Sequence, residues 1–122
     1  MAAAATPDLD TAVPEKIHVV CVISNDGEYN SLRTFQCARF RGRLIGPDLS
    51  DLNFGRLADV YGAVGERITD PNLFAPALRR MLEADRPAVL DVVTDSTQLP
   101  PRFSHVRAFL GLGERTAAPA TG

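Results

Sequence analysis

Runs of apolar residues along the chain predict three strands. Ile17 to Ile23 and Pro87 to Val93 are almost entirely apolar and do not alternate with polar positions. Such runs are typical of strands that are buried on both faces of a parallel sheet. The shorter segment from Ala63 to Ile68 predicts a brief strand that lies between them along the chain.

Apolar residues at helical spacing predict three helices between these strands. The first runs from Tyr29 to about Phe40, the second from Asn53 to Tyr61, and the third from Thr69 to about Ala84. The third has a strong start signal, because Asp70 is a capping residue and proline follows it at the first helical position. The order strand, helix, helix, strand, helix, strand predicts an α/β fold, a partial three-layer α/β/α domain with a short, mostly parallel sheet.

These elements divide the chain into three segments. We expect a flexible N-terminal segment at residues 1–14, the α/β domain at residues 15–95, and a tail at residues 96–122. An apolar stripe predicts one short helix in that tail, at Phe103, Val106, Phe109 and Leu110. The outer strands of so small a sheet have unpaired edges, so we expect self-association through them.

Composition excludes several classes of partner. The chain has 13 basic and 15 acidic residues and a net charge of -2, which provides no broad attraction for nucleic acid or an anionic membrane. No apolar run approaches the ~20 residues that a membrane span needs. The start of the chain lacks a secretory signal, and its acidic residues argue against a transit peptide, so we expect a cytoplasmic protein. Cys21 and Cys37 lie in apolar patterns, and both are expected to be reduced and buried.

The polar cluster directly after the first strand is the main candidate for chemistry. Asn25 and Asp26 offer hard oxygen donors, and Gly27 allows a tight turn. In an open parallel sheet, ligands bind beyond the carboxyl ends of the strands, and the helix start that follows the cluster favours an anion such as a phosphate. The cluster could therefore hold magnesium and a phosphate together. From the residues alone, an ordinary turn is the more frequent role of this tripeptide.

We expect structural or surface roles for the other polar candidates. His18 lies in an apolar strand and His105 in the tail, with no nucleophile in a suitable context, so no catalytic residue is predicted. Asp51 or Asn53 is expected to cap the second helix, and Asp51 is the favoured candidate. Three alternating arginines could meet a phosphate or an acyl-CoA tail, although a solvated loop is the favoured interpretation; they are Arg39, Arg41 and Arg43.

In its order, the first strand and its polar cluster resemble half of a known motif. Ile17 to Ile23 followed by Asn25-Asp26-Gly27-Glu28-Tyr29 is similar to the second half of the thiamine diphosphate fingerprint, where an apolar strand precedes Asn-Asn, two residues and Tyr. The resemblance implies binding of thiamine diphosphate and Mg²⁺. Asp26, at the second Asn position, and the backbone carbonyl of Glu28 would be metal ligands. The cofactor-binding turn would be formed by Asn25, Gly27 and Tyr29.

The resemblance continues downstream and covers roughly residues 8 to 95. The helix from Asn53 to Tyr61, the start at Thr69-Asp70-Pro71 and the last apolar strand follow one another as in the acetolactate synthase and benzoylformate decarboxylase branch of the thiamine diphosphate-dependent enzymes. Leu32 stands where the pyruvate decarboxylase branch carries a glutamate, which favours the first branch. Residues 15–95 are therefore similar to the C-terminal half of a thiamine diphosphate-binding domain.

The other half of the fingerprint opens with Gly-Asp-Gly, which the resemblance would place at or just before Met1. Neither that half nor the pyrimidine-binding domain, with its activating glutamate, occurs in these residues. We therefore expect a cofactor- and magnesium-binding segment of a 2-oxo acid decarboxylase or carboligase, which is a lyase or transferase. The segment is expected to be inactive alone, either as a truncated gene product or as a piece that needs a partner chain for the missing half. The alternative is a non-catalytic α/β interaction module, or a remnant, that has lost the cofactor.

Overall fold

The structure, a computed structural model, describes residues 7–98 of the chain. These residues form two compact units. The sheet unit comprises residues 7–27 and 50–94, and the helix unit comprises residues 28–49 and 95–98. The tail helix that we predicted at Phe103 to Leu110 lies outside the described residues.

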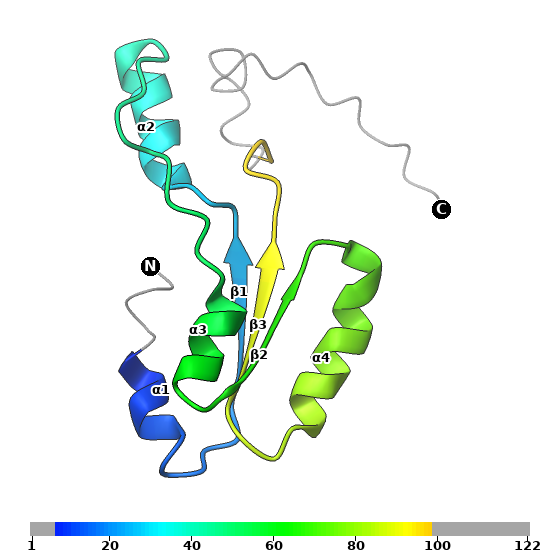
Figure 1. The fold of residues 1–122 in the computed structure, drawn as a ribbon. Helices are drawn as coiled ribbons and strands as arrows, with labels where there is room; N and C mark the ends of the chain where they lie inside the picture. Colours follow the sequence, from blue (N-terminus) through cyan, green and yellow to red (C-terminus); the bar gives the residue numbers. More distant parts are fainter. Residues whose placement is uncertain (1–6, 99–122) are drawn as a thin grey trace. The chain divides into compact units, whose positions relative to one another are not determined.

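The sheet unit contains a three-stranded parallel sheet. Its strands are β1 (Val20–Asn25), β2 (Val64–Ile68) and β3 (Ala88–Val93). The spatial order is β1-β3-β2, so the last strand of the chain lies in the middle and pairs with both others (Figure 1). All three strands point the same way, and the predicted α/β class is confirmed.

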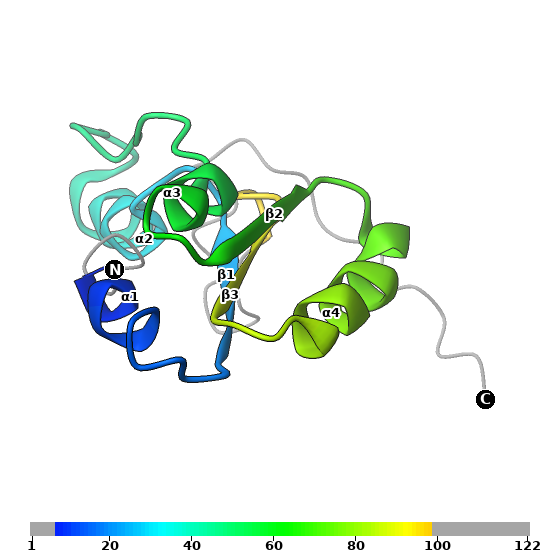
Figure 2. The same ribbon diagram turned by 60° about the horizontal axis from the view of Figure 1, so that its bottom comes forward.

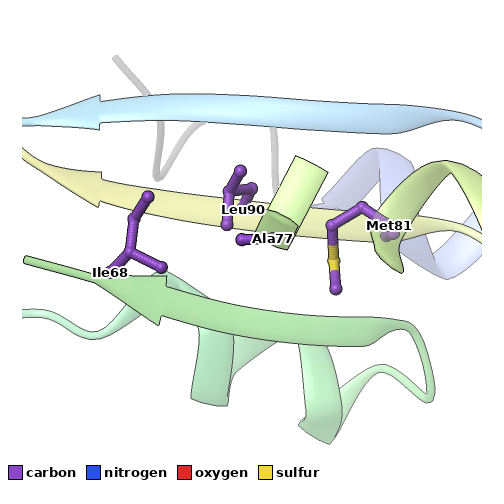
Figure 3. Close-up of a cluster of buried hydrophobic side chains, with 5 residues drawn as sticks. Ile68, Ala77, Met81 and Leu90 are labelled. Atoms are coloured by element: carbon purple, nitrogen blue, oxygen red, sulfur yellow. The ribbon is translucent and has the colours of Figure 1, made fainter. Parts of the chain in front are cut away.

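Helices cover both faces of this sheet (Figure 2). On one face α4 (Phe74–Glu83) packs on β2 and β3, after a short 3-10 turn, η2 (Pro71–Leu73), that Asp70 caps. Figure 3 shows this core, in which Ile68, Met81 and Leu90 meet between helix and sheet; its buried members are Ile68, Ala77, Met81, Ala88 and Leu90. The unit therefore has three layers, as predicted.

The second core lies on the opposite face, under α1 (Pro7–Ala12) and α3 (Phe54–Val60). Its buried members are Leu9, Ala58, Ala63 and Val89. We expected residues 1–14 to be flexible, but Leu9 is 8% exposed and α1 lies within that segment. From Pro7 onwards, that segment is part of the packed sheet unit because α1 supplies an apolar side chain to the core.

The first strand differs from its prediction in position and in burial. It begins at Val20 rather than Ile17 and extends to Asn25, because its hydrogen-bonding partner β3 spans only that length. β1 is also an edge strand of the described sheet, and Val22 is 46% exposed. The prediction of burial on both faces is therefore wrong for β1, whereas residues Ala88 to Asp91 of β3 are fully covered.

The helix unit consists of α2 (Asn30–Phe40) and the loop that follows it. The helix ends at Arg41, which has a left-handed backbone conformation, with a φ of 52°. The side chain of Gln36 then holds the loop, because its Nε2 donates to the carbonyl of Ile45 at 3.0 Å and its Oε1 accepts from the Ile45 N–H at 2.8 Å. No helix of the described residues is long and apolar enough to cross a bilayer.

Candidate functional site

The predicted turn begins at the carboxyl end of β1, in the sheet unit. Asn25 is the last residue of the strand, and Gly27 has a φ of +70°, a conformation that glycine adopts without steric cost. The carbonyl of Asn25 accepts a hydrogen bond from the N–H of Thr94 at 2.9 Å. This bond extends the pairing of β1 and β3 by one residue and fixes where the turn leaves the sheet.

Both ends of the Asn25 side-chain amide bind the protein itself. Oδ1 accepts from the N–H of Gly27 at 3.2 Å, which closes the turn, and Nδ2 donates to the carbonyl of Leu52 at 3.0 Å. Asn25 therefore shapes the turn and ties it to the segment before α3.

Asp26 lies between the two residues that this hydrogen bond joins, and its side chain is partly buried. A carboxylate at this position is a hard oxygen donor one residue beyond a parallel strand, where ligands of such sheets bind. Magnesium typically takes one or two protein carboxylates and completes its coordination with phosphate oxygens and water. The donor chemistry of the turn therefore fits magnesium held together with a diphosphate.

Glu28 and Tyr29 belong to the helix unit, because the boundary between the units falls after Gly27. The carboxylate of Glu28 forms an ion pair with Arg33, and both side chains are largely covered. The N–H of Tyr29 donates to the carbonyl of Pro47 at 2.7 Å, and Tyr29 stands just before α2. Because the Glu28 carboxylate already pairs with Arg33, its backbone carbonyl is the better candidate for a metal ligand.

The described residues contain no group of three or more His, Cys, Asp or Glu side chains that could hold a metal ion. A magnesium ion that is bound with a diphosphate does not need such a group, because phosphate oxygens and water supply the remaining ligands. The single carboxylate of Asp26, in the sheet unit, is consistent with this second kind of site.

A buried polar network beside the turn was not predicted from the sequence. Asp91, in the middle of β3, is fully buried, and its Oδ2 accepts from the N–H of Phe54 at 3.0 Å and lies 3.6 Å from Nε of Arg67. Arg67 also donates to Asp51 at 2.6 Å. The signal was present in the sequence, since a carboxylate within an apolar strand is almost never buried without a partner.

Asp51 is not the cap of α3, contrary to our prediction. The cap is Asn53, whose side chain accepts from the N–H of Arg56 at 2.9 Å. Asp51 instead pairs with Arg67, and this hydrogen bond raises the pKa of Arg67 further, so the guanidinium keeps its charge. Two acidic or amide residues two positions apart compete for one capping site, and only the tertiary contact decides between them.

The other candidates that the structure describes lie at the surface. His18 was expected within the apolar strand, but it precedes β1 and is exposed, with its Nε2 3.2 Å from Oδ1 of Asp85; His105 lies outside the described part of the chain. Arg39, Arg41 and Arg43 are exposed. Within the helix unit, Arg43 lines an open groove of about 270 Å³ together with Gln36, Phe40 and Ile45.

Comparisons with known proteins give the same family as the resemblance. Residues 2–92 match the family model described as "Thiamine pyrophosphate enzyme, C-terminal TPP binding domain". Acetolactate synthase of Bacillus subtilis (strain 168) is 29% identical over 107 residues, which are 81% of this chain and 19% of that protein. The mitochondrial acetolactate synthase catalytic subunit of Aspergillus candidus is 28% identical over 88 residues, 72% of this chain and 13% of that protein.

Solved structures agree. The thiamine diphosphate-dependent 4-hydroxybenzoylformate decarboxylase of Rhodococcus jostii RHA1 is 33% identical with a TM-score of 0.68, over 74% of this chain and 17% of that one. Benzoylformate decarboxylase of Polynucleobacter necessarius, 24% identical, shares the fold with a TM-score of 0.70 over 79% of this chain and 18% of that one. The chain spans less than a fifth of the length of these relatives. It belongs to the thiamine pyrophosphate enzyme family, as a C-terminal cofactor-binding domain.

Proposed function

We propose that this chain provides the diphosphate- and magnesium-binding turn of a thiamine diphosphate-dependent decarboxylase or carboligase that acts on 2-oxo acids. Family membership supports the cofactor, and the Asn25 side chain is the observation that carries the assignment to this turn. Its hydrogen bonds to Gly27 and Leu52 give the residues around Asp26 a defined shape at the carboxyl end of the sheet. A defined turn at this position is what an anionic ligand of a parallel sheet requires.

The residues of the turn have separate roles in this proposal. The carboxylate of Asp26 and the backbone carbonyl of Glu28 would hold Mg²⁺, while Asn25, Gly27 and Tyr29 shape the loop that receives the diphosphate. Thiamine diphosphate, when bound, supplies the carbanion-stabilising chemistry of decarboxylation and carboligation. The protein's part is to hold and orient the cofactor, and no residue of this chain is assigned a proton-transfer step.

The test is a calorimetric titration of the 122-residue chain with thiamine diphosphate in the presence and absence of Mg²⁺. We expect saturable, magnesium-dependent binding that Asp26→Ala abolishes and Asp26→Asn retains, because asparagine keeps an oxygen donor at the same position. Asp85→Ala is the matched control, since it removes an exposed carboxylate from the loop that precedes β3. Equal binding by the parent chain and Asp26→Ala would contradict the assignment of Asp26.

A second candidate function is a non-catalytic α/β interaction module that has lost the cofactor. The exposed apolar side chains of β1 and of the residue before it favour this candidate, because an edge strand with Val22 at 46% exposure, preceded by Val19 at 43%, can pair with a partner. Absence of any heat with thiamine diphosphate and Mg²⁺, together with self-association of the chain, would favour this module over the cofactor-binding segment.

We also propose that catalysis needs groups beyond this set of residues. The Gly-Asp-Gly half of the fingerprint and the activating glutamate would come from elsewhere in the protein or from a partner chain. Addition of a family member's pyrimidine-binding and Gly-Asp-Gly segments to the chain should then produce 2-oxo acid decarboxylation. Decarboxylation by the 122 residues alone would contradict this requirement.

A further inference from the structure

The buried carboxylate of Asp91 is unusual among the polar groups of the sheet unit. It lies on the middle strand, in register with Ile23 of β1 and Arg67 of β2, and no part of the residue is exposed. Its Oδ2 accepts a hydrogen bond from the N–H of Phe54 and lies 3.6 Å from Nε of Arg67, whereas Oδ1 has no hydrogen-bond partner among the described residues. Stability alone does not explain such a buried carboxylate, because replacement of a buried ion pair by apolar residues is often neutral or stabilising.

The groups that Asp91 and Arg67 hold belong to one short segment, residues 51–54. Arg67 binds the carboxylate at the start of that segment, and Asp91 binds the N–H at its end, which is the first residue of α3. The two anchors come from the middle strand β3 and from its neighbour β2. The segment is therefore fixed to the sheet at its two ends, with Leu52 held between them.

Leu52 is the residue through which this segment reaches the turn. Its carbonyl accepts from Nδ2 of Asn25, and Oδ1 of the same side chain accepts from the N–H of Gly27. An amide side chain is planar and rigid, so fixing Nδ2 also fixes the direction of Oδ1. The position of the Leu52 carbonyl therefore sets the orientation of Asn25 and, with it, the shape of the backbone on either side of Asp26.

We propose that Asp91 and Arg67 are positioning residues that hold the Asn25–Gly27 turn in place through residues 51–54. The path contains four links, all within the sheet unit: buried Asp91 with Arg67, the segment 51–54, the Asn25 side chain, and the Gly27 amide. Only the last step, that the held turn serves Mg²⁺ and the diphosphate, rests on the proposed function.

Hydrogen exchange of the Gly27 amide, measured by NMR on the ¹⁵N-labelled 122-residue chain, tests the path. Asp91→Leu removes the acceptor of Phe54, and we expect exchange at Gly27 to rise about tenfold, as for the loss of one hydrogen bond, while amides within β2 keep their rates. Asp91→Asn restores an oxygen acceptor and should recover most of the protection. Asp70→Leu, which removes a carboxylate that accepts from Asn72 in the same unit, should leave Gly27 unchanged.

Arg67→Met is the second variant and covers the case in which Asp91→Leu does not fold. The Arg67 side chain is 22% exposed, so the only fully buried group that loses its ion-pair partner in this variant is the carboxylate of Asp91. We expect exchange at Gly27 to rise selectively. Wild-type exchange at Gly27 in Arg67→Met, or an equal rise there and throughout β2, would overturn the proposal.

Calorimetry on the same variants separates this inference from the proposed function. If the parent chain binds thiamine diphosphate with Mg²⁺, Asp91→Leu should weaken that binding about tenfold and Asp91→Asn should restore it. If the parent chain does not bind the cofactor, the proposed function fails, while the exchange at Gly27 still decides whether Asp91 and Arg67 position the turn. If exchange at Gly27 rises selectively and cofactor affinity does not fall, the turn is held by Asp91 and Arg67 but does not serve Mg²⁺ and the diphosphate.

Discussion

At the scale of single residues, the end of β1 depends on a side chain that has both a donor and an acceptor. Asn25 uses the acceptor to close the turn on Gly27 and the donor to reach Leu52. An aspartate at position 25 would keep the first bond and lose the second, because a carboxylate only accepts. Asparagine therefore suits position 25 on structural grounds.

The two cysteines of the chain should differ sharply in reactivity. Cys37 on α2 has no exposed surface, and burial raises the pKa of its thiol, with Arg33 acting in the opposite direction; Cys21 on β1 is exposed. The thiolate is the reactive form. Iodoacetamide at pH 8 should therefore modify Cys21 in the folded chain and modify Cys37 only after urea is added, as peptide mass mapping would show. Modification of both at similar rates would contradict the burial of Cys37.

The raised pKa of Cys37 also predicts a pH dependence of stability. Because the folded state holds the thiol proton more tightly than the unfolded state, this contribution is fully present below the ordinary thiol pKa and is lost as the pH rises through the folded-state pKa. The free energy of unfolding should therefore fall as the pH rises above about 9, the ordinary value. Cys37→Ala is the control, and urea titrations across this range should show a shallower fall in that variant.

At the scale of elements, α3 sits on β2 at a distance that only two facing glycines allow. A Cβ added to Gly65 would lie 1.8 Å from the carbonyl oxygen of Gly55, and one added to Gly55 would lie 3.0 Å from the backbone of Glu66. The atoms in the way are backbone atoms, so no side-chain rotation can relieve the contact. This close approach brings the start of α3 under Asp91.

Gly65→Ala should therefore destabilise the chain strongly. Overpacking of a well-packed site typically costs 1–3 kcal/mol, and with backbone on both sides we expect about 3 kcal/mol, measured by urea unfolding. Gly27→Ala is the comparison, since its Cβ would meet nothing within 4 Å and the cost of about 1 kcal/mol comes from the positive φ alone. Equal losses in the two variants would mean that α3 can move away from β2 at little cost.

The predictability of these elements follows from how local their causes are. The span of β3 and the start of η2 at Asp70-Pro71 were predicted closely, because apolar runs and capping residues act within a few positions. The bounds of β1 were not, since its pairing partner β3 begins 68 residues later at Ala88. Sequence alone also could not choose between Asp51 and Asn53 as the cap of α3.

The candidate site divides in the same way. The turn at Asn25, Asp26 and Gly27 was recognisable because its residues are contiguous and follow a strand. The support beneath it was missed because the bond between Phe54 and Asp91 joins residues 37 positions apart. An acidic residue within an apolar strand can be recognised in the sequence. The backbone N–H from which it accepts a hydrogen bond, however, depends on how the strands and α3 pack.

At the scale of the whole molecule, the sheet unit leaves one edge strand with apolar side chains in contact with solvent. Ile17 and Val19, just before β1, and Val22 on β1 are between 43% and 49% exposed, because α4 of the same unit packs on β2 and β3. Natural proteins usually protect such edges with charges, proline or covering segments. The sequence of β1, VCVISN, contains no charged residue and no proline.

This edge predicts self-association that a single charge should weaken. In sedimentation velocity, the average mass of the 122-residue chain should rise with concentration, because an unpaired apolar strand pairs with another copy. Val22→Lys places a charge on that strand and should shift the chain towards the monomer, with little loss of stability since the position is half exposed. Val60→Lys makes the same change on α3, which packs on β2 and β3, at a position that is 81% exposed, and should leave association through β1 unchanged. If the chain stays monomeric at every concentration, β1 is protected in solution. If the two lysine variants have equal effects, the contact lies elsewhere.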